Sequence, residues 1–483
     1  MPGGASKQFL AVHKEPSMPQ LFISAAHKSS GKTTLSIGLC AAFRQRGLQV
    51  QPFKKGPDYI DPMWLTRAAG RDCYNLDFNT MSTTEILAKT GRGADADLCL
   101  TEGNKGLYDG LDLDGSNSNA ALATLLEAPV ILVIDAQGMT RGIAPLILGY
   151  QAFAPEVEIA GVILNQLGGH RHEAKLRAVI DHYTDVPVVG AVHRNPALQI
   201  CERHLGLVPS NEAAAVERQI DALVQAVEAQ VDLDRLLQIA AAHPLPDASA
   251  PARAASPAAD LRIAIARDAA FGFYYPDDLE AFAAAGVELV PFDALHDEAL
   301  PAAIDGLFIG GGFPETQMQS LEANRSLRAD IRRAIDTGLP TYAECGGLMY
   351  LTRSVSWQGQ RCEMVGALPA DSVMHRRPQG RGLVRLRETD AMPWPGEPAE
   401  RTINAHEFHY SALENLGSNL PFAYEILRGT GIDDRHDGLL HRNTLACYAH
   451  LRDVAGNHWV ARFVDFVRQQ KAAQTPVAAG SHH

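Results

Sequence analysis

The sequence predicts two α/β domains in one chain, the first built on a parallel sheet. Short apolar runs alternate with amphipathic segments over residues 19–242, and a similar alternation resumes within residues 261–470. This alternation is typical of strands covered by helices. Between the two regions, residues 243–260 are rich in proline, alanine and serine, which is typical of a linker.

In the first domain we expect buried strands at the apolar runs and helices between them. The expected strands are 21–26, 48–53, 97–101, 130–135, 159–164 and 186–192, with helices that include 33–46 and 172–182. In the second domain we expect strands at 261–266, 287–291, 304–309 and 340–343, helices at 277–285 and 325–337, and a strand-rich remainder from 362 to 467. Residues 1–18 read as a flexible tail, and residues 471–483 as a second tail that ends in a tag remnant.

Composition narrows the class of protein. The chain has 483 residues, which suits two or three domains, and its formal charge of −13 argues against nucleic acid and anionic membranes as general partners. Its seven cysteines are scattered without a CxxC pair, which favours a reducing compartment and hence the cytoplasm. No apolar run reaches the roughly 20 residues that a membrane span needs.

A phosphate-binding loop is predicted at residues 29–34, SSGKTT, directly after the first apolar run. In such a loop the backbone N–H groups surround phosphate oxygens, Lys32 adds a positive charge, and the Thr33 hydroxyl can bind Mg²⁺. Ala26 stands where the usual pattern has its first glycine, so a plain turn before a helix remains the alternative. The residues expected to bind ATP here are Ser30, Gly31, Lys32, Thr33 and Thr34.

Carboxylates follow several of the expected strands. Asp135 ends the run 130–135 and could reach Mg²⁺, or it could simply cap the strand. Residues 54–62, KKGPDYIDP, read as a rigid loop and a poor helix, and residues 102–110, EGNKGLYDG, as a glycine-rich loop with Glu102 and Asp109 at its ends. Open α/β sheets bind ligands at the carboxyl ends of their strands, although each loop could also be a solvated turn.

A second site is predicted around Cys345. This cysteine lies between an expected strand and a glycine pair, which exposes a nucleophile and lowers its pKa, although most single cysteines are inert core residues. His450, at the end of CYAH, is the candidate base. The backbone N–H groups of Gly311, Gly312 and Gly346 are candidates for an oxyanion hole.

Together these segments resemble the cobyrinate a,c-diamide synthase family, also called hydrogenobyrinate a,c-diamide synthase. The matching segments span about residues 20 to 465 in the family's order. They are SSGKTT, KKGPDYIDP, EGNKGLYDG, VIDAQGMTRG, GGGFPE, AECGGLMYL, AHEFHYS and CYAHL.

The resemblance implies a dethiobiotin-synthetase-like ATP domain joined to a class I glutamine amidotransferase-like domain. Such an enzyme is a carbon–nitrogen ligase with glutamine as the amido donor, and a homodimer is one assembly to consider. Cys345 would release ammonia from glutamine with His450 as base, and ATP with Mg²⁺ would phosphorylate the a and c carboxylates of a tetrapyrrole. Ammonia would then displace the phosphate.

The resemblance also assigns residues by position. Thr33, Glu102 and Asp135 are the expected Mg²⁺ ligands, and Asn165 would lie near the adenine. The expected substrate and synthetase residues are Lys55, Asp58, Tyr59, Asp61, Glu102, Asp109, His406 and His409, with Glu407 in the same motif. Because a polycarboxylate substrate needs cations near it, further candidates are Lys54, Arg171, Arg376, Arg377 and Arg381.

Departures from the family pattern bear on the substrate and on the thiol site. Asn104-Lys105 stands where the family reads Val-Met, and this departure resembles a subgroup associated with dissimilatory sulfite reductase. That resemblance implies a sirohaem or sirohydrochlorin substrate, with cobyrinate or hydrogenobyrinate as the alternative. Arg452 occupies the position of the usual catalytic glutamate, so the third member of the site is absent or comes from elsewhere.

Two alternatives belong to other functional classes. One is a ParA/MinD-like nucleotide switch with an inactive amidotransferase domain, which Cys345, His450 and the presence of His27 in place of a signature lysine argue against. The other is a plain glutaminase or scaffold, which would leave the phosphate loop unexplained.

Overall fold

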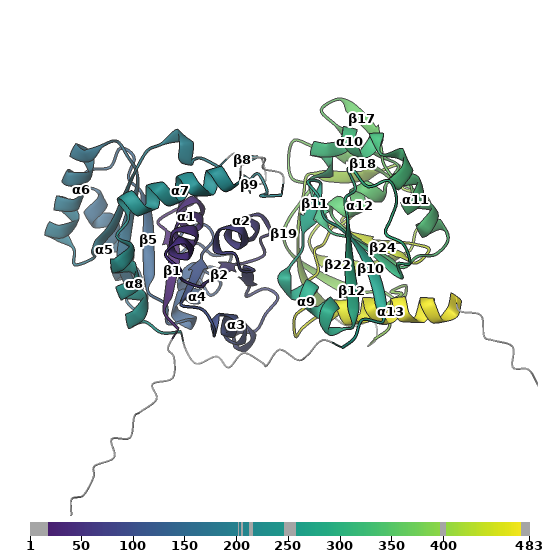
Figure 1. Cartoon of the computed structure of the whole chain (residues 1–483), viewed down its shortest axis with the longest axis horizontal. Coiled ribbons are helices and arrows are strands. Elements are labelled where there is room, and N and C mark those ends of the chain that lie inside the picture. The colour runs from purple at the N-terminus through teal and green to yellow at the C-terminus, as the bar shows by residue number, and fades with distance from the viewer. Residues whose placement is uncertain are drawn as a thin grey trace, which may run out of the picture.

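The computed structural model describes residues 18–200, 202–203, 206–211, 216–245, 257–396 and 402–474. Its two α/β domains lie side by side, one coloured purple to teal and the other green to yellow (Figure 1). Most of the predicted tails and the middle of the predicted linker, residues 1–17, 246–256 and 475–483, lie outside the described residues.

The first domain is a seven-stranded sheet in the order β3-β2-β4-β1-β5-β6-β7, with every pairing parallel, as predicted. The strands are β1 Gln20–Ala25, β2 Val50–Lys55, β3 Tyr74–Leu76, β4 Leu98–Glu102, β5 Val130–Asp135, β6 Ile159–Leu167 and β7 Val188–His193. The helices are α1 Lys32–Gln45, α2 Ile60–Ala69, α3 Thr83–Thr90, α4 Asn119–Leu125, α5 Ile143–Phe153, α6 His170–Tyr183, α7 Val216–Gln230 and α8 Leu233–Ala242. Short elements are η1 Gly91–Gly93, η2 Pro196–Leu198, β8 Glu202–Arg203 and β9 Gly206–Leu207.

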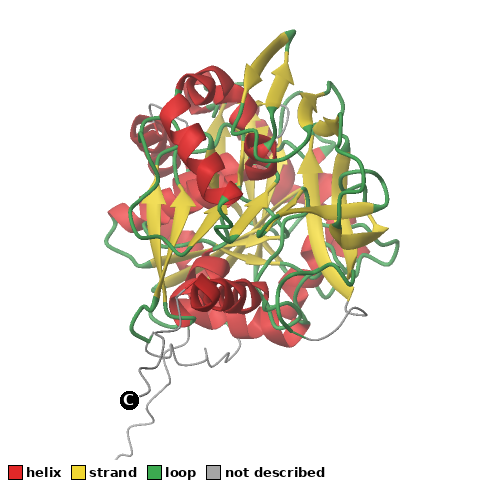
Figure 2. Cartoon of the chain, turned by 90° about the vertical axis from the view of Figure 1, so that its right-hand side faces the viewer, coloured by secondary structure: helices red, strands yellow, loops and turns green. Residues whose placement is uncertain are grey.

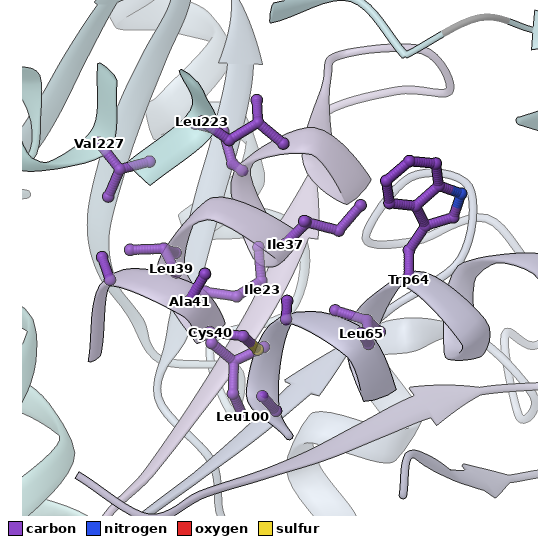
Figure 3. Close-up of a cluster of buried hydrophobic side chains, with 14 of the residues drawn as sticks. Ile23, Ile37, Leu39, Cys40, Ala41, Trp64, Leu65, Leu100, Leu223 and Val227 are labelled. Atoms are coloured by element: carbon purple, nitrogen blue, oxygen red, sulfur yellow. The ribbon is translucent and has the colours of Figure 1, made fainter. Parts of the chain in front are cut away.

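Helix α1 is packed between the sheet and α7, and this packing fixes the loop that precedes it. Figure 3 shows Ile37 and Leu39 of α1 close to Leu223 and Val227 of α7. The helices approach closely because residue 38 is glycine: a Cβ there would lie 2.7 Å from Val227 Cγ2. A rigid α1 holds its first residues at the carboxyl edge of the sheet, where ligands of open α/β sheets bind.

The second domain is a nine-stranded mixed sheet in the order β12-β10-β13-β15-β24-β23-β22-β19-β20, parallel as far as β24 and antiparallel beyond it. In the view onto this domain, helices pack around its strands (Figure 2). The sheet strands are β10 Leu261–Ala266, β12 Val287–Phe292, β13 Gly306–Ile309, β15 Thr341–Glu344, β19 Gly380–Glu388, β20 Thr402–His409, β22 Phe422–Arg428, β23 His436–His441 and β24 Thr444–Cys447. The helices are α9 Pro276–Ala284, α10 Met318–Ala323, α11 Arg325–Asp336, α12 Gly346–Leu351 and α13 Trp459–Gln474, with η3 at Pro314–Gln317. Smaller strands are β11 Phe271–Phe273, β14 Gly311–Gly312, β16 Ser354–Trp357, β17 Gln360–Glu363, β18 Asp371–Met374 and β21 Ser411–Glu414.

Three sequence-based expectations were wrong at their edges. Residues 60–62 are not loop, because α2 begins at Ile60; Pro62 is tolerated because the first turn of a helix needs no N–H donor there. The strand-rich remainder, predicted to run from 362 to 467, ends earlier, because the last strand, β24, ends at Cys447 and α13 begins at Trp459. That helix also runs to Gln474, beyond the predicted start of the tail at residue 471.

Ion pairs and hydrogen bonds join the two domains. Lys89 and Arg92 of the first domain pair with Asp277 and Glu280 of α9. Arg452, which is almost fully buried, donates to Asn75 O at 2.6 Å across the boundary. The domains therefore meet through specific polar contacts. Among the described residues, no helix has both the length and the apolar composition needed to cross a membrane.

Candidate active site

The predicted phosphate loop lies between β1 and α1, as the sequence indicated. Gly31 has φ 85°, and a Cβ at this position would lie 2.1 Å from Asn165 Nδ2, so only glycine fits. Asn165 donates to Ser30 O at 2.9 Å. The Asn165 amide thus braces the loop, and its place near the adenine stays a prediction. Thr34 follows in the first turn of α1.

Beside this loop lies a buried group of charges centred on Lys54. Its ammonium is 2.5 Å from Asp61 Oδ2 and 2.8 Å from Glu102 Oε1. The Thr33 hydroxyl donates to the same Glu102 oxygen at 2.7 Å and to Asp61 at 3.2 Å, and Lys32 Nζ is 3.5 Å from Glu102. Five predicted residues therefore meet: Lys32, Thr33, Lys54, Asp61 and Glu102. Lys54 pairs with carboxylates of this chain, and its suggested contact with a substrate carboxylate stays a prediction.

The pKa values in this group follow from burial and neighbouring charge. Burial and the adjacent Lys54 charge lower the pKa of Lys32. Burial alone would lower the pKa of Lys54, but Asp61 and Glu102 raise it above its usual range. Burial and the Asp61 charge raise the pKa of Asp58 to about 7, although Lys54 opposes this. Anionic phosphate would find two closely spaced ammonium groups here.

These residues fit a magnesium ion. Glu102 Oε2 is buried without a hydrogen-bond partner, and it lies in a set of carboxylate and hydroxyl oxygens of the kind that Mg²⁺ prefers. Asp135, the other predicted ligand, accepts a hydrogen bond from Gln137 N at 2.9 Å, as a strand-end cap does. Its role in metal binding stays a prediction.

The second site is built around a sharp turn at Cys345. This residue follows β15 directly, has φ 47°, and begins the turn into α12. The turn is tight, since a Cβ on Gly347 would lie 2.1 Å from Ile309 O. A Cβ on Gly346 would lie 3.0 Å from Gly312 N and O, so these two predicted oxyanion-hole backbones adjoin. Gly311 is next to the predicted base, its Cβ position being 2.7 Å from His450 Cε1.

His450 is held between Cys345 and Glu344. Its Nδ1 lies 3.4 Å from Glu344 Oε2, and both side chains are buried. Burial alone would lower the pKa of His450, but the adjacent Cys345 and Glu344 side chains raise it to about 10. Glu344 is itself fixed, since its Oε1 accepts from Tyr342 Oη at 2.6 Å and from Leu451 N at 3.0 Å. This arrangement favours the imidazolium form of His450 beside the Cys345 sulfur.

A cavity of about 210 Å³ opens onto Cys345. Residues of the second domain form most of its wall, and Tyr59 of the first domain closes one side, with its ring centroid 5.2 Å from that of His450. His409 lines this cavity. Two contacts hold its ring there: it stacks on the ring of Tyr448, and its Nδ1 donates to Ser411 O at 2.7 Å. The sequence had assigned His409 to the synthetase site, whose cleft it does not line.

A larger cleft of about 880 Å³ lies between the domains. Its basic residues are Lys55, Lys105, Arg381 and Arg428, and the predicted Asp109, His406 and Glu407 line it too. Arg171, Arg376 and Arg377 do not line it. The cleft and the thiol cavity share three wall residues, Pro57, His406 and Phe408.

Comparison with known proteins assigns the two domains. Residues 22–207 match the family model of the CobQ/CobB/MinD/ParA nucleotide binding domain. Residues 262–456 match that of the CobB/CobQ-like glutamine amidotransferase domain. A solved glutamine amidotransferase covers 43% of this chain and 98% of its own at 14% identity, but its TM-score of 0.32 is too low to carry an argument.

Full-length relatives decide the family. A cobyrinate a,c-diamide synthase of Magnetococcus marinus is 46% identical over 95% of this chain and 99% of its own length. Synthases of the same name from Methanosarcina acetivorans and Archaeoglobus fulgidus are 41% and 39% identical, over 95% and 94% of this chain and 97% and 98% of their own. The chain belongs to the cobyrinate a,c-diamide synthase family.

Membership of this synthase family confirms the fold class and the prediction of a carbon–nitrogen ligase that takes its nitrogen from glutamine. The alternatives of a nucleotide switch and of a scaffold gain no support from relatives that match along nearly the whole chain. Sequence reasoning missed Glu344, although a glutamate that directly precedes the cysteine at the end of an apolar strand was a usable signal. It also missed Arg428, whose place depends on the sheet order.

Proposed function

We propose that the chain amidates peripheral carboxylates of a tetrapyrrole, with ATP as the activating substrate and glutamine as the nitrogen donor. The observation that carries this proposal is the shared wall of the thiol cavity and the cationic cleft, formed by Pro57, His406 and Phe408. Ammonia released on one side of this wall would have only a few side chains to pass before it reaches a bound carboxylate on the other.

In the glutaminase half, the Cys345 sulfur adds to the carboxamide carbon of glutamine. His450 gives its proton to the leaving nitrogen, the C–N bond breaks, and ammonia and a thioester result. Backbone N–H groups of Gly312 and Gly346 would stabilise the oxyanion. Water then hydrolyses the thioester to glutamate, with Glu344 keeping the His450 ring in its orientation.

In the synthetase half, an oxygen of the substrate carboxylate attacks the γ-phosphorus of ATP, and ADP leaves. The acyl phosphate then has a good leaving group, so ammonia adds to its carbonyl carbon and phosphate departs. Lys32 and Lys54 offset negative charge as it develops on the transferred group. Mg²⁺, if held by Thr33 and Glu102, would supply further charge neutralisation at the phosphates.

His406 lines both the thiol cavity and the cationic cleft, and its uncharged ring suits the passage of ammonia between them. Burial and the nearby His450 charge lower its pKa well below the usual value, so its ring stays neutral. Its ring lies parallel to that of His450 with centroids 4.9 Å apart, and Tyr59 packs beside both. A neutral, aromatic wall would not bind ammonia as ammonium, so ammonia could pass it as the neutral nucleophile. Ammonia that escaped into water would be protonated and would lose its nucleophilicity.

The relatives' names support a cobyrinate-type macrocycle as the substrate. A sirohaem or sirohydrochlorin type is the second candidate. It is favoured by the cleft position of Asn104 and Lys105, the two residues that depart from the family pattern. Hydrogenobyrinate would differ from cobyrinate only in its lack of metal. A cytoplasmic location and a homodimer stay predictions, as does the absence of nucleic-acid partners.

The test is incubation with ATP, Mg²⁺ and glutamine against cobyrinate, hydrogenobyrinate, sirohydrochlorin and sirohaem. Mass spectrometry counts each replacement of a hydroxyl by an amino group. Cys345→Ser should lose the reaction with glutamine and keep it with ammonia, while Lys32→Ala should lose both. Cys362→Ser, a buried cysteine away from the site, is the matched control. Full product formation by Lys32→Ala would contradict the proposal.

A further inference from the structure

A loop of the first domain presents leucines to solvent at the mouth of the cationic cleft. Leu111 lines the cleft and is 56% exposed, and Leu113, two residues further on, is 107% exposed. Leu113 has the largest exposed fraction among the large apolar side chains of the described residues. Isolated surface leucines are common, but two of them together beside a cleft need an explanation.

The loop that carries these leucines is held in shape by its own polar groups. Asn117 Oδ1 accepts from Leu111 N at 2.7 Å, and Asn117 Nδ2 donates to Asp112 at 2.6 Å. A Cβ on Gly110 would lie 2.7 Å from Asn117 Oδ1, so glycine is needed for this close approach. These hydrogen bonds hold the loop in shape, while the Leu111 and Leu113 side chains stay exposed.

The cleft beside the leucines has three cationic side chains without ion-pair partners among the described residues, although the Arg381 guanidinium lies 5.3 Å from the centroid of the Phe408 ring. Lys105, Arg381 and Arg428 line it, and none of the three forms an ion pair with any residue that the structure describes. The acidic residues that also line it already accept hydrogen bonds from the chain: Asp77, Asp109, Asp112 and Glu407. An occupant of this cleft should therefore combine an apolar surface with several carboxylates.

We propose that residues 110–117 form one wall of the substrate site, where Leu111 and Leu113 pack on the face of the macrocycle. Lys105, Arg381 and Arg428 bind its peripheral carboxylates at the same time. This inference rests on the proposed function, because a tetrapyrrole with acidic side chains has both the flat apolar face and the anionic rim. The leucines act in binding and take no part in the chemical steps.

The test compares the wild-type enzyme with Leu111→Ser/Leu113→Ser and with Leu148→Ser, an exposed leucine on α5. The Kd for the macrocycle is read from its absorption spectrum, and its KM from ammonia-dependent amidation. We expect the double variant to raise Kd and KM by about tenfold or more, because burying one leucine is worth about that factor. The KM should change more than kcat.

Varying the ionic strength distinguishes the cationic contacts with the macrocycle from the apolar ones. Raised ionic strength screens the cationic contacts and spares the apolar ones, so the double variant should keep the salt dependence of the wild type, with a Kd that is higher by the same factor at every ionic strength. An unchanged Kd and an unchanged KM in the double variant would overturn the inference while amidation by the wild type upholds the proposed function. If the wild type neither binds nor amidates any of the four macrocycles, the proposed function fails and takes this inference with it.

Discussion

Glutamine in place of Glu344 should slow glutamine hydrolysis and shift its pH profile. Glu344 is buried beside His450, and its Oε1 accepts from Tyr342 Oη and Leu451 N. A glutamine side chain has nearly the same shape, and its carbonyl oxygen can accept both bonds. What it loses is the negative charge that faces His450, so the change isolates electrostatic orientation from packing.

The expected loss of glutaminase rate follows from the two roles of the Glu344 carboxylate, which orients His450 and supplies its charge partner. An acid–base group that loses its orientation and its charge partner typically costs about 10²- to 10⁴-fold in rate. Burial opposes a charged His450, but the adjacent Cys345 and Glu344 side chains raise its pKa to about 10. Removing the Glu344 charge, 3.4 Å from Nδ1, should lower that pKa. The imidazolium exists below its pKa, so the alkaline limb of the profile moves to lower pH.

The assay is glutamate formation against pH, with kcat/KM extracted at each value. Glu363→Gln, on the exposed strand β17, is the matched control and should behave as the wild type. Ammonia-dependent amidation monitors the integrity of the synthetase half. A variant whose alkaline limb stays in place, or whose kcat/KM falls less than a few-fold, would refute the assignment of Glu344 as the group that positions His450.

Three further changes test the rest of the site. Lys54→Met should lower the free energy of unfolding by about 3–5 kcal/mol, because it removes the nearest counter-charge of the buried Glu102 and the partly buried Asp61; urea denaturation measures this. Burial lowers the pKa of Lys55 to about 8, so its ammonium is lost as pH rises through that value; macrocycle binding should weaken there, and Lys55→Met should remove this dependence in binding titrations. Gly312→Ala should abolish glutaminase activity, because its Cβ would lie 2.0 Å from Ala270 O, whereas Gly149→Ala, with open space around it, should not.

The phosphate loop and the nucleophile turn could be predicted because their signals are local. A strand, a glycine turn and Lys32 are consecutive in the sequence, and so are the strand, Cys345 and its glycine pair. The start of α2 was also encoded locally but was overlooked: Asp58 Oδ1 accepts from Ile60 N and Asp61 N, as residues that begin a helix commonly do. Aspartate at that position was the signal.

Contacts that depend on sheet order could not be predicted. Lys54 meets Glu102 because β2 and β4 are neighbours in a register that pairs these two residues, although 47 residues lie between them. Glu344 lies opposite Cys447 in the pairing of β15 with β24, which brings it to the segment that carries His450. Nothing in the local sequence specifies either register, because both follow from how the whole sheet packs.

The same geometry explains why the two reactions belong in one chain. Tyr59 comes directly before α2, whose second residue, Asp61, is bound to Lys54 in the synthetase half. The Tyr59 ring packs 5.2 Å from His450 and 4.4 Å from Tyr275 in the glutaminase half. A shift of Lys54 toward bound phosphate would pull on Asp61 and hence on the start of α2. Because Tyr59 lines the thiol cavity, we expect such a shift to alter that cavity.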